Sequence, residues 1–346
     1  MSEKITTEPF RWRHLVAGLV LWVALAATAT AGAQEPQYLR MATGGIAGTY
    51  YPIGNLIAAA VSNPPGSRPC DKGGSCGVPG LVVVVESSNG SIDNVEMIGA
   101  GEVELALSQA DIAYWAYHGT GPFAKTGPIR SLRAIANLFE ETMHVVVRRD
   151  SGITGIGQLA GKRVSLGEPA SGTLIEAKAV LAAYGLDEFA IDARFLAPGA
   201  ASLALAGGEI DAFFFVGGYP VGGVAELART VDIALLPIEA TQADELIAFY
   251  PFLARTVIPK GTYHGVAETP TIGVGAQLLV ADGVDADLVY GITRALWHPH
   301  TRKLLDRGHP KGREIKREGA LIGIGIPLHD GAERYYREVG MLAKTP

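Results

Sequence analysis

The chain contains little cysteine and no excess of positive charge. Its 346 residues include two cysteines, Cys70 and Cys76, and 29 Lys and Arg against 35 Asp and Glu, a formal net charge of −6. Because nucleic acids bind to basic surfaces, this charge argues against a nucleic-acid partner. The cysteine spacing does not match the Cys-x-x-Cys pairs of zinc sites, and no further cysteine could complete such a site.

Long apolar runs are also scarce, and the one that could approach a membrane span lies near the start of the chain. Residues 15–27 are unbroken apolar sequence, preceded by Lys4, Arg11 and Arg13 and followed by small residues up to Ala33. The run is shorter than the ~20 residues that cross a bilayer, and the pattern is typical of a secretory signal peptide. We therefore predict that residues 1–33 are a signal peptide cleaved near Ala33 and that the mature chain is periplasmic. An uncleaved anchor helix is the alternative.

The two cysteines lie in a stretch rich in proline and glycine, residues 63–80. In an oxidising compartment, a local disulfide between Cys70 and Cys76 is expected. We predict that this bond orders a surface loop and takes no part in binding.

The rest of the chain alternates apolar strand patterns with helical patterns. Apolar residues make up 48% of the sequence and charged residues 18%, enough for two buried cores in a mature chain of roughly 310 residues. The alternation indicates an α/β fold with mostly parallel sheets, which bind ligands at the carboxyl ends of their strands. Strands are predicted over residues 38–42, 81–85, 102–107, 132–139, 144–148, 163–167, 194–196, 212–216, 233–237 and 271–280, and helices over 49–61, 91–101, 111–118, 173–184, 201–206, 224–229, 243–250, 285–305 and 332–342.

A glycine-rich turn, residues 43–51, connects the first predicted strand to the first predicted helix. Glycines such as Gly45 let the backbone approach a ligand closely, and a helix start at Thr49 and Tyr50 offers free N–H groups that favour an anion. A nucleotide loop is disfavoured, because the pattern is G-G-x-x-G and the acidic residue expected about 20 positions further on is absent. A tight turn without a ligand is the alternative.

The second half of the chain repeats this design at residues 167–173. A strand there gives way to a helix that begins with Ser171, Gly172 and Thr173. Two helix starts, one from each half, could hold one acidic ligand between them. Ser171 as a plain helix N-cap is the alternative.

Three further polar turns are candidates for orienting a ligand. Ser91 and Asn94 follow the second predicted strand, Gln109 closes the next one, and Glu140 lies where the two halves are expected to join. Helix caps or a solvated hinge explain these residues equally well.

Patterns for catalysis and metal binding are weak. Residues 73–77 match the G-x-S-x-G of hydrolases, but they lack the strand and helix that a nucleophile elbow needs. His298, His300 and His309 offer imidazoles, but Pro299 breaks the helical spacing and no carboxylate clearly joins them. We therefore predict no enzymatic activity, no metal and no cofactor.

Several short motifs occur in an order that resembles one known family. They lie at residues 43–54, 90–94, 101–106, 149–153, 159–164, 167–173 and 208–212. Their order and spacing are similar to those of the TAXI solute-binding proteins of TRAP (tripartite ATP-independent periplasmic) transporters, over about residues 38–341. The loop with Cys70 and Cys76 departs from the commonest pattern.

The resemblance implies a type II periplasmic-binding-protein fold, with two α/β lobes, a ligand cleft between them and two crossover strands. It implies capture of a small acidic organic solute, such as a glutamate-like amino acid, a 2-oxo acid or a dicarboxylate, for delivery to the TRAP membrane permease subunits. The family lacks the arginine with which other TRAP binding proteins grip a carboxylate. The family's site, carried over to this chain, points to Gly45, Thr49, Tyr50, Ser91, Ser171 and Thr173.

We expect a monomer in which residues 34–141 and 254–346 form the first lobe and residues 142–253 form the second. The passages between the lobes are expected near residues 140–144 and 250–255. A periplasmic sensor that presents its ligand to a receptor kinase is an alternative function, and an exported enzyme on the same fold is a less favoured one.

Overall fold

The computed structural model describes Met1 and residues 35–343. The predicted signal peptide and its cleavage near Ala33 lie outside these residues. Among the residues that are described, no helix combines the length and the apolar composition that crossing a membrane requires.

Strands and helices alternate along the chain much as predicted. The strands of the main sheet are β1 Gln37–Ala42, β4 Leu81–Glu86, β5 Leu105–Gln109, β6 Leu132–Arg148, β7 Arg163–Ser165, β8 Asp192–Arg194, β9 Ala212–Gly217, β10 Ile233–Leu235, β11 Ala254–Ile258 and β12 Thr269–Ala281. The α-helices are α2 Tyr50–Val61, α3 Ser91–Ala100, α4 Ala110–His118, α5 Gly172–Ala183, α6 Pro198–Ala206, α7 Gly222–Thr230, α8 Ala240–Phe249, α9 Ala286–Leu296, α10 Pro299–Gly308 and α11 Asp330–Glu338. Two short strands, β2 Ser62–Asn63 and β3 Val78–Pro79, pair separately.

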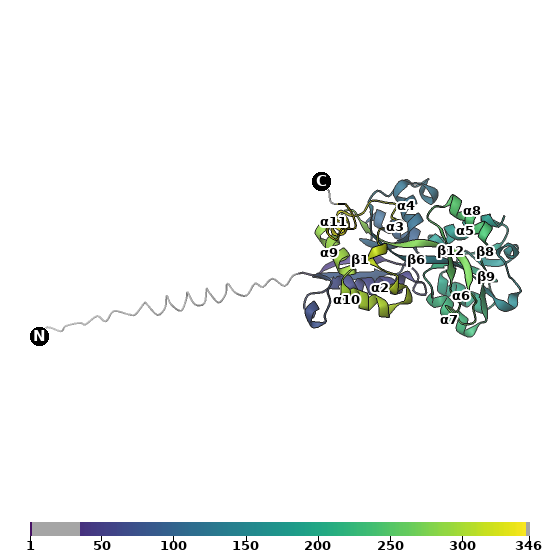
Figure 1. The fold of residues 1–346 in the computed structure, drawn as a ribbon, viewed down its shortest axis with the longest axis horizontal. Coiled ribbons are helices and arrows are strands. Elements are labelled where there is room, and N and C mark those ends of the chain that lie inside the picture. Colours follow the sequence, from purple (N-terminus) through teal and green to yellow (C-terminus); the bar gives the residue numbers. More distant parts are fainter. Residues whose placement is uncertain (2–34, 344–346) are drawn as a thin grey trace.

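The ten strands of the main sheet within residues 35–343 follow the order β4-β1-β5-β12-β6-β9-β7-β8, with β10 paired to β6 and β11 paired to β12. On one side β1 pairs in parallel with β4 and β5, and on the other β7 pairs in parallel with β8 and β9. Helices cover both halves, which form two lobes (Figure 1). The predicted α/β fold with two lobes is confirmed.

The long strands β6 and β12 pair antiparallel in the middle of the sheet and run from one lobe into the other (Figure 1). Along β6, Phe139 packs in the first-lobe core and Met143 in a second-lobe core. Along β12, Val274 packs in that second-lobe core and Ala276 in the first-lobe core. Each lobe therefore has its own core, and these two strands carry the chain between them.

The two passages differ from the prediction in detail. The two strands predicted over residues 132–139 and 144–148 are one strand of 17 residues, because the polar residues between them pair with β12. The second passage lies in β12 and not near residues 250–255. Ile258, Tyr263 and Val266 pack with Phe213 in a second-lobe core, so residues 254–274 pack with the second lobe although the sequence assigned them to the first.

The closing helix predicted over residues 285–305 is two helices. α9 ends at Leu296, and α10 begins at Pro299 with His298 as its N-cap. Proline lacks a backbone N–H and its ring clashes with the preceding turn, so it starts a helix and does not continue one.

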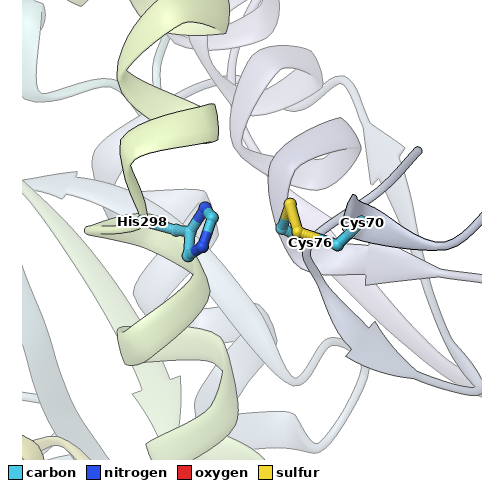
Figure 2. Close-up of side chains that lie close together, drawn as sticks. All are labelled: Cys70, Cys76 and His298. Carbon is cyan, nitrogen blue, oxygen red and sulfur yellow. A yellow bond between two sulfur atoms is a disulfide. The ribbon is translucent and has the colours of Figure 1, made fainter. Parts of the chain in front are cut away.

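Cys70 and Cys76 form the predicted disulfide, in the loop between β2 and β3. Figure 2 shows this bond facing His298 at the start of α10. The two sulfurs and an imidazole nitrogen lie within 4.8 Å of one another. Because the sulfurs are bonded to each other, they are not thiolates that could ligate a metal. Nδ1 of His298 accepts a hydrogen bond from the N–H of His300, 3.1 Å away, so this cluster is structural.

Replacing Cys70 and Cys76 together with serine should lower the stability by about 2 kcal/mol, because the bond no longer restricts the unfolded chain. The melting temperature should fall by a few degrees. Ligand affinity should not change, since no residue of this loop lines the cavity between the lobes. Thermal unfolding and titration calorimetry of the double variant measure both quantities, and a clear loss of affinity would contradict a purely structural role.

Candidate functional site

A cavity lies between the lobes, where strands from both of them end. The space between its walls, including the open mouth, is about 490 Å³. Its walls come from the turn after β1, from the starts of α2, α3, α5 and α6, and from Gln109, Glu141 and Phe215 on three strands. This is the position at which α/β sheets bind ligands.

Eight of the ten predicted binding residues line this cavity, and they come from both lobes. They are Gly45, Thr49, Tyr50, Ser91, Gln109, Ser171, Gly172 and Thr173.

The helix starts supply hydrogen-bond donors to the cavity. First-turn N–H groups have no acceptor inside their own helix and carry partial positive charge. Within residues 35–343, the N–H groups of Tyr50, Gly172 and Thr173 donate to no other protein group. Both lobes therefore present free backbone donors at this place.

The hydroxyls of the first lobe hold the protein together around the cavity. Thr49 Oγ1 donates to the carbonyl oxygen of Gly218 in the second lobe, 2.8 Å away. The Tyr50 hydroxyl donates to Oε2 of Glu141 at 2.6 Å. These hydroxyl hydrogens are already used, so their role is to position the helix start of α2.

The two hydroxyls at the start of α5 differ in whether their hydrogen is still free to bond to a ligand. Ser171 is the N-cap: its Oγ accepts from the N–H of Leu174 at 3.2 Å and donates to the carbonyl oxygen of Glu168 at 2.7 Å. Thr173 Oγ1 accepts from the N–H of Val216 at 3.1 Å, and its hydrogen has no acceptor among the described residues. Ser171 therefore fits the alternative of a plain cap, and Thr173 keeps a hydroxyl donor for a ligand.

Gly172 allows the two lobes to approach closely. Gln109 reaches across from β5, and its Nε2 donates to Oε1 of Glu176 on α5 at 2.9 Å. A Cβ added to Gly172 would lie 1.3 Å from Oε1 of Gln109. A larger residue at this position cannot coexist with the contact between Gln109 and α5.

Further backbone hydrogen bonds join the lobes beside the cavity. The N–H of Gly223 donates to the carbonyl oxygen of Ala47 at 2.9 Å, and the N–H of Asp93 donates to that of Ala170 at 3.1 Å. The lobes are thus in contact around the cavity, in a closed arrangement.

Two of the predicted residues lie elsewhere. Asn94 is fully buried, and its Nδ2 donates to the carbonyl oxygens of Thr43 and Leu107, 2.6 Å from each. It braces the turn after β1 against β5. Glu140 accepts a hydrogen bond from the Thr256 hydroxyl, 2.5 Å away, and points away from the cavity because successive side chains of a strand face opposite sides.

The same alternation places the next residue, Glu141, in the cavity wall. Glu168, in the turn before α5, is a second carboxyl in the wall, and Phe215 of β9 adds an apolar surface. None of the three is among the predicted binding residues. Recognising β6 as one continuous strand would have identified Glu141, whereas Phe215 gives no signal beyond that of an apolar strand.

The cavity is acidic. Among the described residues that line it, none is lysine or arginine. Burial raises the pKa of Glu141 to about 8, and the hydrogen bond from Tyr50 opposes part of this shift. Burial also raises the pKa of Glu168 and of Asp111 to about 7. It raises the pKa of Glu176 well above its usual range, and the charges of Asp111 and Glu141 add to this effect.

These pKa values should make the ligand-free protein less stable as the pH rises. Between the ordinary value of 4.5 and the folded value of about 8, Glu141 keeps its proton in the folded state and loses it in the unfolded state. The unfolded state then binds fewer protons, so the free energy of unfolding falls as the pH rises through this window. In Glu141→Gln, the decrease in the free energy of unfolding between pH 5 and pH 8 should be smaller than in the parent by at least about 1 kcal/mol. This amount is close to the free energy that corresponds to one pKa unit.

Urea denaturation at the two pH values measures this difference, and Glu140→Gln is the matched control. A Glu141→Gln profile that coincides with that of the parent would contradict the prediction.

The chain is similar to several solved structures at low sequence identity. A structure described as a periplasmic transporter has a TM-score of 0.49 and 16% identity, covering 88% of this chain and 93% of that one. The substrate binding protein of an amino acid ABC transporter has a TM-score of 0.46 and 14% identity, covering 79% and 100%. The alkanesulfonate-binding protein SsuA from Xanthomonas axonopodis pv. citri, bound to MOPS, has a TM-score of 0.43 and 15% identity, covering 89% and 81%.

One protein-family model also matches, over residues 41–340. The match takes in both lobes, both crossing strands and every residue that lines the cavity. The chain therefore belongs to the NMT1-like family.

Proposed function

We propose that this chain is an exported solute-binding protein of a TRAP transporter of the TAXI type. It captures a small acidic organic solute between its lobes in the periplasm and delivers it to the membrane permease subunits. The observation that carries this proposal is the meeting of free backbone donors at Tyr50 of the first lobe with those at Gly172 and Thr173 of the second, in one cavity.

The chemistry of the donors favours a carboxylate. Helix N-termini attract anions through their N–H groups and their dipoles. Of the helices that begin at the cavity walls, α2 and α5 present N–H groups that have no partner among the described residues, and these groups do the work that an arginine does in other carboxylate sites. The order of the sequence motifs, which resembles that of the TAXI proteins, supports the transporter type.

The same geometry couples binding to closure. A solute that touches the helix starts of both lobes interacts with both only when the lobes are closed, and this difference in contact shifts the equilibrium toward the closed form. The hydrogen bonds from Thr49 to Gly218 and from Gly223 to Ala47 then form as well. The permease recognises this closed form.

Thr173→Val should weaken binding of the solute by about one to two powers of ten, because it removes a hydroxyl donor to a charged group. Thr173→Ser, which keeps the hydroxyl, is the matched control. Ser171→Ala should instead lower stability by about 1 kcal/mol through loss of the cap, with a smaller effect on affinity.

Titration calorimetry with glutamate, 2-oxoglutarate and C4 dicarboxylates, after native mass spectrometry to find a retained ligand, measures these changes. If no small carboxylate binds to the parent protein, the proposed function is wrong.

Gly172→Ala should hinder closure without harming the fold, because the Gln109 side chain would have to turn away from α5. Alanine is well tolerated in a helix, but its Cβ would overlap Oε1 of Gln109. We expect affinity to fall by more than about tenfold, which is 1.4 kcal/mol, while the ligand-free melting temperature stays close to that of the parent. Gln109→Ala in the same chain removes the overlap and should recover part of the closure, seen as a smaller radius of gyration in X-ray scattering with ligand. If Gly172→Ala closes and binds as the parent does, the contact is not required.

A further inference from the structure

A buried lysine lies where the two lobes meet, outside the wall of the cavity. The side chain of Lys311 is only 1% exposed. Lysine is almost never fully buried without a partner, because its ammonium group loses its shell of water. Lys311 lies in a short helical turn, Pro310–Arg313, and Leu305 and Ile315 on either side of this turn pack in the first-lobe core. The charge therefore belongs to the first lobe and needs partners near it.

The ammonium group of Lys311 has a partner in each lobe. Its Nζ donates to Oε2 of Glu314 in the first lobe, 2.9 Å away. It also lies over the ring of Tyr219, 3.9 Å from the ring centre, and this ring packs with the second-lobe core that contains Phe213. A cation over the face of a tyrosine ring is attracted by the negative charge of that face. One buried charge thus connects the two lobes.

The turn that contains Tyr219 packs tightly against the first lobe. The carbonyl oxygen of the preceding residue, Gly218, accepts the hydroxyl hydrogen of Thr49, a residue of the cavity wall, at 2.8 Å. A Cβ added to Gly218 would lie 2.7 Å from Cγ of Lys311 and 2.8 Å from Cε2 of Phe139. The turn can approach the lysine stem this closely because Gly218 has no side chain.

Hydrogen bonds within the second lobe fix the same turn. The N–H of Val221 donates to the hydroxyl of Tyr263 at 2.9 Å, and this hydroxyl lies 2.8 Å from Nε2 of His144. Nδ1 of His144 lies 2.9 Å from the carbonyl oxygen of Thr142 and therefore carries the ring hydrogen, so Nε2 accepts the hydroxyl hydrogen. The turn, and with it the ring of Tyr219, is held to the body of the second lobe.

We propose that the contact between Lys311 and Tyr219 is a latch that stabilises the closed arrangement of the lobes. This inference rests on the proposed function and adds to it a pair of residues that sets affinity without touching the solute, since neither lines the cavity. Opening of the lobes about β6 and β12 draws the ring away from the ammonium group and returns that group to water. The attraction therefore stabilises the closed form alone, and apparent affinity follows the population of that form.

Removing the ring should weaken the binding of every solute by the same factor. In Tyr219→Leu, we expect the affinities for those of glutamate, 2-oxoglutarate and C4 dicarboxylates that bind to the parent to fall together, by about 3–30-fold, the range of a cation–π contact. Tyr219→Phe keeps the ring and should bind as the parent does. Titration calorimetry measures these affinities. A common factor distinguishes a latch from a residue that contacts the solute, because a contact discriminates between solutes.

A double-mutant cycle connects this loss to Lys311. Lys311→Met keeps an unbranched apolar side chain and removes the charge. In that background, Tyr219→Leu should change affinity by no more than about twofold, because the attraction is already absent. Lys316→Met removes an exposed lysine of the same segment and should leave the full effect of Tyr219→Leu in place. Circular dichroism confirms that each variant is folded.

An equal effect of Tyr219→Leu with and without the charge of Lys311 would overturn the latch and leave the proposed function standing, and so would losses that differ strongly between solutes. If no small carboxylate binds to the parent, the proposed function is wrong, and X-ray scattering of the ligand-free chain then decides on the latch. A larger radius of gyration in Tyr219→Leu than in the parent would support it, and equal radii would overturn it.

Discussion

The antiparallel pairing of β6 with β12 is the interaction on which the rest of the architecture depends. The register runs from Gly273 opposite Thr142 to Ala281 opposite Leu132, so each strand contributes to both halves of the sheet. β5, β1 and β4 extend the sheet on one side, and β9, β7 and β8 on the other. Because strands of both halves end at the boundary between the lobes, the turns and helix starts that follow them face one another.

The cavity between the lobes arises from this arrangement of strands and helix starts. It does not depend on any single residue with a catalytic pattern. Neither lobe completes the cavity alone, because the backbone donors of α2 and those of α5 belong to different lobes. The side chains at these helix starts mostly hold the backbone in place: Thr49 and Ser171 use their hydroxyls within the protein. Within residues 35–343, the protein leaves the backbone N–H groups of Tyr50, Gly172 and Thr173 unpaired.

The parts of the site that depend on local patterns could be predicted from the sequence. A glycine-rich turn between a buried strand and a helix can be recognised from a few consecutive residues. The sequence therefore predicts the turns that contain Gly45 and Gly172. Which of Glu140 and Glu141 faces the cavity depends on the alternation of side chains along the whole of β6. The polar residues in the middle of this strand made it read as two separate strands in the sequence. The burial of Asn94 depends on carbonyl groups far away in the sequence, and no local pattern encodes it. The packing of residues 254–274 with the second lobe gives no local signal either, because β11 contains few apolar residues.

The hydrogen bonds that join the lobes have a kinetic consequence. The bonds from Gly223 to Ala47 and from Asp93 to Ala170 lie between backbone groups of the two lobes, and they must break before a trapped solute can leave. The time for which the solute stays bound is therefore set partly by contacts that it never touches, whereas its entry depends on the open form alone. Since affinity differences between related complexes reside mostly in the dissociation rate, under the proposed function these backbone contacts allow the residence time of the solute to change without altering which solute the cavity selects.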